Sequence, residues 1–113
     1  MTKIKLFKRN DIYAAIECSG HTGYDIEGRD IVCASISSIV QSCMLGITKT
    51  LGIRAKVTRR DRDGYIKLEL PLDTEKNLMD KAQLLIEVLI DSITDLLKGY
   101  SKYISMEVIE DVY

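Results

Sequence analysis

The stretch KIKLFKRNDIYAAIEC, residues 3–18, holds two runs in which apolar residues recur at every second position. The first run has Ile4 and Leu6 between lysines, and the second places its apolar residues on one side: Ile12, Ala14, Ile16 and Cys18. A period of two puts these side chains on one face of a β-strand. The Arg-Asn-Asp between the runs is rich in turn-forming residues, so the stretch predicts a β-hairpin.

Three more runs with this period follow, over residues 54–59, 65–70 and 103–108. The link between the first two of them ends in Asp63-Gly64, which is a strong signal for a tight turn. Each of the five runs has one apolar and one polar face. That pattern is typical of a mainly antiparallel sheet that is covered on one side only.

Two longer segments have the apolar spacing of helices. The first runs from about Ile31 to Leu51 and the second from about Glu75 to Lys98. Gly52 and Gly99 follow them, and glycine is common just beyond a helix end. The sequence therefore predicts an α+β fold, a two-layer sandwich with two helices on one face of the sheet, in the order β-β-α-β-β-α-β.

The chain has 113 residues, and we expect a single domain over residues 1–113. A net charge of −1 argues against direct capture of nucleic acid, which favours a basic domain. The cysteines form no Cys-x-x-Cys pair, and no apolar run reaches the length of a signal peptide or a membrane span, so we expect a cytoplasmic protein without membrane contact. One histidine and three scattered cysteines lack metal-ligand spacing, and we expect no metal or other cofactor.

The second helical segment is apolar around more than half of its circumference. One apolar stripe at helical spacing consists of Leu78, Ala82, Leu85, Leu89 and Ile93. The apolar residues outside this stripe are Leu84, Ile86, Val88, Ile90, Leu96 and Leu97. These side chains cannot all contact one sheet, so some of them are expected to contact the first helix. The remainder either thickens the core or meets a second copy of the chain in a homodimer.

A candidate nucleophile lies at the entry to the first helix, in EGRDIVCASIS, residues 27–37. Asp30 stands where an N-cap residue belongs, which places Cys33 in the first helical turn. The amide N–H groups of that turn have no intrahelical partner, and the helix dipole favours negative charge there. We therefore expect a thiolate of Cys33 to be stabilised, and the same N–H groups to serve as an oxyanion hole.

The one histidine, His21, follows the second strand directly and begins a loop that contains several glycines. A histidine that reaches Cys33 can act as its general base, and Asp30 or Ser37 can orient the pair. Each of these residues also has an ordinary structural interpretation: a solvated loop histidine, a buried small thiol, a helix cap and a helical serine. Cys18 and Cys43 are expected to face the core.

The run SGHTGYDIEGRDIVCASIS, residues 19–37, resembles the signature of the ribosomal-processing cysteine proteases. The matching residues are a glycine-histidine loop, Gly20 and His21, followed by Asp-Ile-Val-Cys-Ala at the start of the first helix. The length of the chain and the order of its elements also match that family. Three residues depart from the small residues expected at their positions: Thr22, Asp25 and Ser35.

This resemblance implies a homodimeric cysteine endopeptidase that removes a short N-terminal extension from a large-subunit ribosomal protein. Cys33 would be the nucleophile and His21 the general base, Asp30 and Ser37 would support them, and Gly20 would give the histidine loop its freedom. An alternative is a non-catalytic peptide-binding or ribosome-assembly module. A redox-sensing thiol protein is a third hypothesis, which the core-facing positions of Cys18 and Cys43 disfavour.

Overall fold

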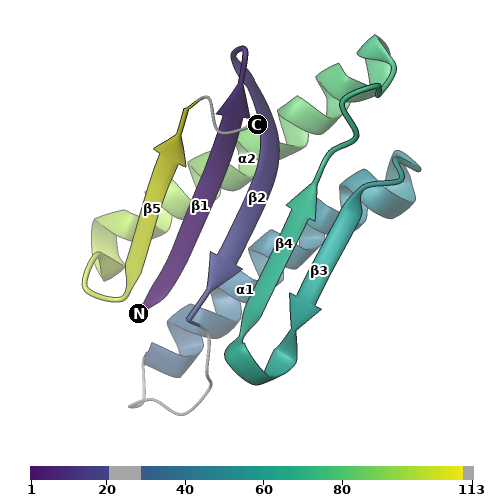
Figure 1. The fold of residues 1–113 in the computed structure, drawn as a ribbon. Coiled ribbons are helices and arrows are strands. Elements are labelled where there is room, and N and C mark those ends of the chain that lie inside the picture. Colours follow the sequence, from purple (N-terminus) through teal and green to yellow (C-terminus); the bar gives the residue numbers. More distant parts are fainter. Residues whose placement is uncertain (21–28, 111–113) are drawn as a thin grey trace.

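A computed structural model describes residues 1–20 and 29–110 of the chain. Five strands form one sheet in the order β3-β4-β2-β1-β5. The elements are β1 (Thr2–Arg9), β2 (Ile12–Ser19), α1 (Arg29–Leu45), β3 (Lys56–Arg60), β4 (Tyr65–Glu69), α2 (Lys76–Tyr100) and β5 (Ile104–Ile109). The predicted order of elements is confirmed (Figure 1).

The sheet is mixed, with antiparallel pairing between β1 and β2, β2 and β4, and β3 and β4. The last strand, β5, pairs with β1 in parallel, from Thr2 opposite Ile104 to Phe7 opposite Ile109. The β1–β2 hairpin turns at Asn10 and Asp11, whose φ angles are 51° and 63°. Asparagine and aspartate tolerate this left-handed conformation better than other residues with a side chain. The predicted hairpin is therefore confirmed.

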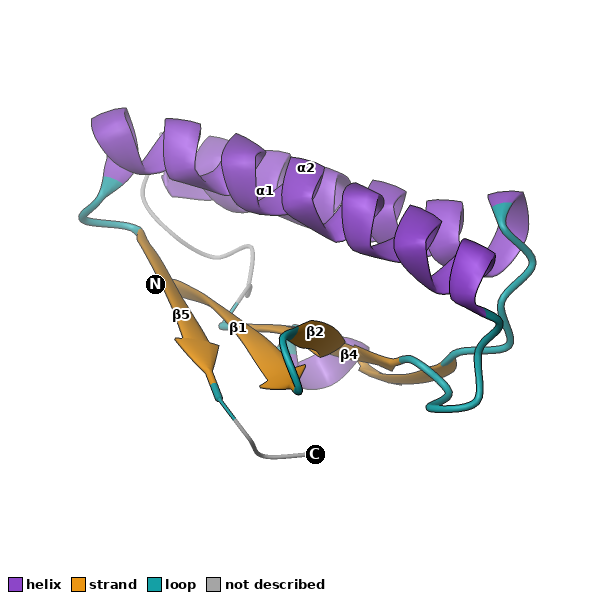
Figure 2. Cartoon of the chain, turned by 90° about the horizontal axis from the view of Figure 1, so that it is seen from above, coloured by secondary structure: helices purple, strands orange, loops and turns teal. Residues whose placement is uncertain are grey.

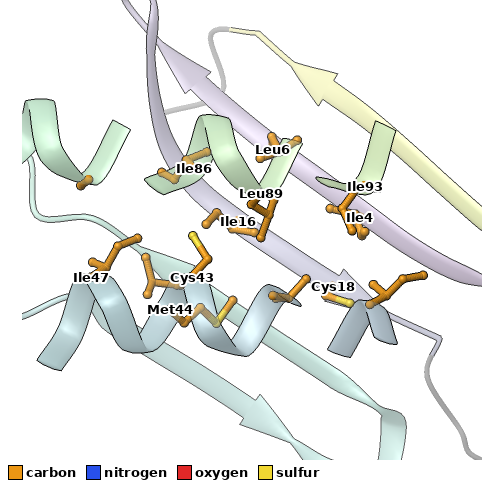
Figure 3. Packing of buried hydrophobic residues seen from close by; sticks show 14 of the residues in the cluster. Ile4, Leu6, Ile16, Cys18, Cys43, Met44, Ile47, Ile86, Leu89 and Ile93 are labelled. Carbon is orange, nitrogen blue, oxygen red and sulfur yellow. The ribbon is translucent and has the colours of Figure 1, made fainter. Parts of the chain in front are cut away.

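Both helices lie on one side of the sheet, so the molecule has two layers (Figure 2). Between the layers, Ile86, Leu89 and Ile93 of α2 contribute to the same core as Ile4 and Leu6 of β1 (Figure 3). These five side chains are at most 1% exposed. The predicted two-layer α+β sandwich is confirmed, and its core lies between the sheet and the two helices.

Some apolar residues on the predicted core faces are nevertheless exposed, namely Ile12, Val57 and Val108. Val57 and Val108 lie on β3 and β5, which are the two edge strands of the sheet. Ile12 is the first residue of β2, beside the hairpin turn. Alternation alone predicts the face of a strand, but not how far along or across the sheet the covering helices reach.

The first helix begins at Arg29 and continues through a π-helical turn, Gly46–Thr50, to Gly52, which adopts a φ of +70°. Gly52 therefore ends this helix as predicted. The segment Ile31–Thr50 is long and apolar enough to cross a membrane, contrary to the sequence-based expectation. In the fold, however, its apolar residues Ile36, Val40 and Ile47 are fully buried in the core between helix and sheet.

The second helix starts as predicted but ends later. The Glu75 side chain caps it by accepting hydrogen bonds from the backbone N–H groups of Asn77 and Leu78. The helix continues through Gly99 to Tyr100, so the prediction of Gly99 as its C-terminal cap is wrong. A glycine inside a helix costs only about 1 kcal/mol relative to alanine, which a long packed helix tolerates.

Candidate active site around Cys33

Cys33 is the fifth residue of α1 and is only 3% exposed. Its Sγ lies 3.0 Å from the hydroxyl oxygen of Thr2, at the start of β1. Thr2 shares the core face of its strand with Ile4 and Leu6, and its side chain is 0% exposed. The sulfur therefore points toward the sheet and contacts a buried hydroxyl.

The start of α1 corrects one part of the predicted site. Asp30 lies inside the helix as its second residue and does not precede it as an N-cap. Because α1 already begins at Arg29, Cys33 lies one turn into the helix rather than in its first turn, where the free amide N–H groups are.

His21 lies outside the described residues, so the predicted pairing with Cys33 stays a prediction. Its neighbour Gly20 is described and has a φ of +85°. A Cβ atom on Gly20 would overlap the carbonyl oxygen of Met1, so only glycine allows this close approach of the two backbone segments. The segment that carries His21 therefore starts beside the beginning of β1, where Thr2 contacts Cys33.

Ser37 lies one turn beyond Cys33 on α1 and is half-buried. Its hydroxyl accepts a hydrogen bond from Nε2 of Gln41 at 2.7 Å. This bond runs along the helix and away from the sulfur. Among the predicted supporting residues, the structure thus places Gly20 near the Thr2–Cys33 contact, and it gives Ser37 a partner of its own.

Thr2 is the site residue that the sequence-based reasoning missed. It stands two residues before Ile4, in phase with the apolar side chains of the strand. A polar residue on an otherwise apolar strand face is a signal for a buried hydrogen bond, because an unpaired buried hydroxyl is costly. That signal was present in the sequence, although the identity of the partner was not.

Cys18 and Cys43 are buried, which confirms that they face the core. Burial raises the pKa of each thiol to about 11. For Cys18, interactions with Cys33 and Glu17 contribute to this raised pKa after burial, which indicates that the Cys18 and Cys33 sulfurs lie within electrostatic reach of each other. Both thiols therefore stay protonated at neutral pH, and they are poor nucleophiles there.

The described residues also contain two surface hollows away from Cys33. One of about 360 Å³ lies between α1 and α2 and includes Cys43, Leu85 and Val88 in its lining. Another of about 250 Å³ lies beside the β1–β2 turn. No group of three His, Cys, Asp or Glu residues that would suit a metal ion occurs within the described parts of the chain.

Residues 1–105 match the family model described as cysteine protease Prp. The chain belongs to this family of cysteine proteases. A Prp relative from Bacillus subtilis (strain 168), named ribosomal processing cysteine protease Prp, is 28% identical over 86 residues, which cover 76% of this chain and 77% of the relative. The predicted family is confirmed, and its activity is that of a peptide hydrolase.

Solved structures with a similar fold cover nearly the whole chain. A Streptococcus mutans protein is 26% identical, with a TM-score of 0.86 and coverage of 98% of this chain and 96% of its own. The essential ribosomal processing protease Prp from S. aureus, in complex with a substrate peptide, is 18% identical, with a TM-score of 0.82 and coverage of 96% and 99%. At that level of identity the S. aureus structure supports the α+β architecture alone.

Proposed function

We propose that this chain is an endopeptidase that removes a short N-terminal extension from a large-subunit ribosomal protein in the cytoplasm. The name of the B. subtilis relative, a ribosomal processing protease, supports the substrate class. S. aureus Prp has been crystallised with a substrate peptide and with a covalently linked product peptide. The observation that carries the proposal here is the position of Cys33, near the start of α1 and beside the segment that leads into His21.

The proposed reaction is acyl transfer through a thioester. His21 accepts the proton of Cys33, and the thiolate attacks the scissile carbonyl carbon. The free N–H groups of the first turn of α1 bind the oxyanion that forms. His21 then donates its proton to the leaving amine, the C–N bond breaks, and water hydrolyses the thioester to release the acyl peptide and restore the thiol.

The burial of Cys33 sets a condition on this mechanism. A nucleophile must approach the carbonyl carbon to about 3–3.5 Å before it can attack. With 3% of the residue exposed, a peptide cannot reach the sulfur in the described conformation. The bound substrate must therefore displace the groups that cover the Cys33 sulfur, and this coupling would keep the thiol from cleaving other peptides.

The direct test is to incubate the purified protein with the N-terminally extended ribosomal protein and to measure product masses. We expect the wild-type protein to remove the extension at a single bond. The His21→Gln variant, which lacks the base, is expected to cleave roughly 100-fold more slowly. Peptide binding without any product from wild type would instead favour the non-catalytic peptide-binding module.

We also propose that the protein acts as a homodimer that uses the outer surface of α1 and α2. Leu84 and Val88 of α2 are 61% and 55% exposed, one helical turn apart. Val88 also lines the hollow of about 360 Å³ between the two helices. An apolar ridge beside an apolar hollow is self-complementary, as a two-fold interface requires.

Substitution of Val88 by aspartate is expected to shift the dimer toward monomer, because it would bury a charge in the contact. Light scattering after size-exclusion chromatography would then give about half of the wild-type mass. Thr94→Asp is the matched control, since Thr94 is exposed on the same helix and lies outside the lining of the hollow. A monomeric wild-type protein at micromolar concentration would contradict the proposal.

A further inference from the structure

Thr2 is the one fully buried polar side chain in the described part of the chain. Its neighbours on the same face of β1, Ile4 and Leu6, are apolar and 0% exposed. Valine has nearly the shape of threonine and would fill this position without a polar atom. A buried hydroxyl is costly unless it is hydrogen-bonded, so the partner of this hydroxyl decides why threonine is tolerated here.

That partner is the sulfur of Cys33, 3.0 Å from the Thr2 hydroxyl oxygen. The backbone N–H of Thr2 is used separately, because it donates to the carbonyl oxygen of Tyr103 at 2.9 Å. The backbone of Thr2 is thus fixed to the residue that precedes β5, and the hydroxyl contacts the sulfur. With a neutral thiol either group can donate, whereas with a thiolate only the hydroxyl can.

We propose that Thr2 is a positioning residue for Cys33, whose hydroxyl donates a hydrogen bond to the sulfur, favours the thiolate and holds the side chain in place. A hydrogen bond to a charged acceptor is roughly twice as strong as one between neutral groups, so the contact strengthens when the proton leaves Cys33. The role of this contact in peptide cleavage rests on the proposed function, but its effect on the thiol does not.

Among the described residues, the titratable side chain found to interact electrostatically with Cys33 is Cys18 on β2. A negative charge on Cys18 would oppose a thiolate on Cys33, but its pKa of about 11 keeps it neutral below pH 9. Tyr103 meets Thr2 through its backbone carbonyl. The Thr2 hydroxyl is therefore the described donor that can offset the cost of a charge on the buried sulfur.

The test is a thiolate titration followed by absorbance at 240 nm between pH 5 and 9. The absorbance of each variant is compared with that of the same variant carrying Cys33→Ala, so that the absorbance changes of tyrosine and of the other cysteines cancel. We expect Thr2→Val to move the titration midpoint upward by about one pH unit, and Thr2→Ser to leave it near that of wild type. Thr58→Val on β3 is the matched control for a threonine-to-valine change in the sheet.

An unchanged midpoint in Thr2→Val, or an equal shift in Thr58→Val, would overturn the proposal. If Thr2→Val does not fold, the comparison of Thr2→Ser with Thr2→Ala isolates the hydroxyl, and equal midpoints there would overturn it as well. With the extended ribosomal protein as substrate, Thr2→Val is expected to lower kcat roughly 10-fold at neutral pH and to leave KM unchanged. At alkaline pH, kcat of the variant is expected to return to the wild-type value. A wild-type protein that does not cleave would refute the proposed function, while the titration would still decide the role of Thr2.

Discussion

Replacement of Cys33 by alanine is expected to lower the rate of cleavage by roughly 10⁴-fold or more, which is the scale of losses when a catalytic nucleophile is removed. The reason is chemical, since alanine cannot form the thioester on which the proposed reaction depends. The measurement is single-turnover cleavage of the extended ribosomal protein, followed by mass spectrometry. Undiminished cleavage by Cys33→Ala would end the proposal that this residue is the nucleophile.

Cys43→Ala is the matched control for this experiment. Cys43 lies further along the same helix, α1, than Cys33, and its buried thiol has a pKa of about 11. Its loss leaves a small cavity and lowers stability, but it removes no group that takes part in the proposed reaction. The variant should therefore melt at a lower temperature than wild type and, below that temperature, cleave at nearly the wild-type rate.

The second large effect is expected for Gly20→Ala. The substitution forces a residue with a Cβ to a φ of +85° and places that atom against the carbonyl oxygen of Met1. Strain and backbone overlap together are expected to reduce the free energy of unfolding by about 3 kcal/mol. Relief of the overlap moves the start of β1, so Thr2 should also lose its contact with Cys33. Urea denaturation and the thiolate titration measure these two consequences separately.

Gly52→Ala provides the comparison that separates strain from overlap. Gly52 also has a positive φ, of +70°, but nothing lies within 4 Å of the position that its Cβ would take. Its substitution is expected to cost only about 1 kcal/mol, from the left-handed backbone alone. Equal losses at Gly20 and Gly52 would show that the approach of Met1 to Gly20 does not constrain the fold.

Much of the fold follows from periodicity in the sequence. Five runs with a period of two became five strands, because one polar and one apolar face suit a sheet covered on one side. The helix ends were harder to predict. Gly99 has the sequence signature of a cap, yet the helix continues to Tyr100, because a glycine within a helix costs only about 1 kcal/mol and does not by itself end it. Asp30 likewise fits an N-cap or a first turn equally well, so its sequence position does not distinguish them.

The candidate site was less predictable, because it depends on which strands are neighbours. Local sequence around Cys33 allowed either a nucleophile or a buried structural thiol, and the resemblance to a protease family favoured the nucleophile. The contact of Cys33 with Thr2 joins residues far apart in the chain and follows from the placement of β1 in the sheet. No local pattern specifies that placement, because alternation predicts a strand and its faces but not its partners.

The parallel pairing of β1 with β5 joins the two most distant strands of the sequence. During synthesis on the ribosome, β1 has no outer neighbour until β5 has emerged, because β5 is the strand that pairs with that edge of β1. Such long-range closure is slow relative to hairpin and helix formation. The contact of Thr2 with Cys33, the proposed nucleophile, is thus expected to be secured late in folding, and a chain truncated before Tyr103 would lack the backbone hydrogen bond that holds Thr2.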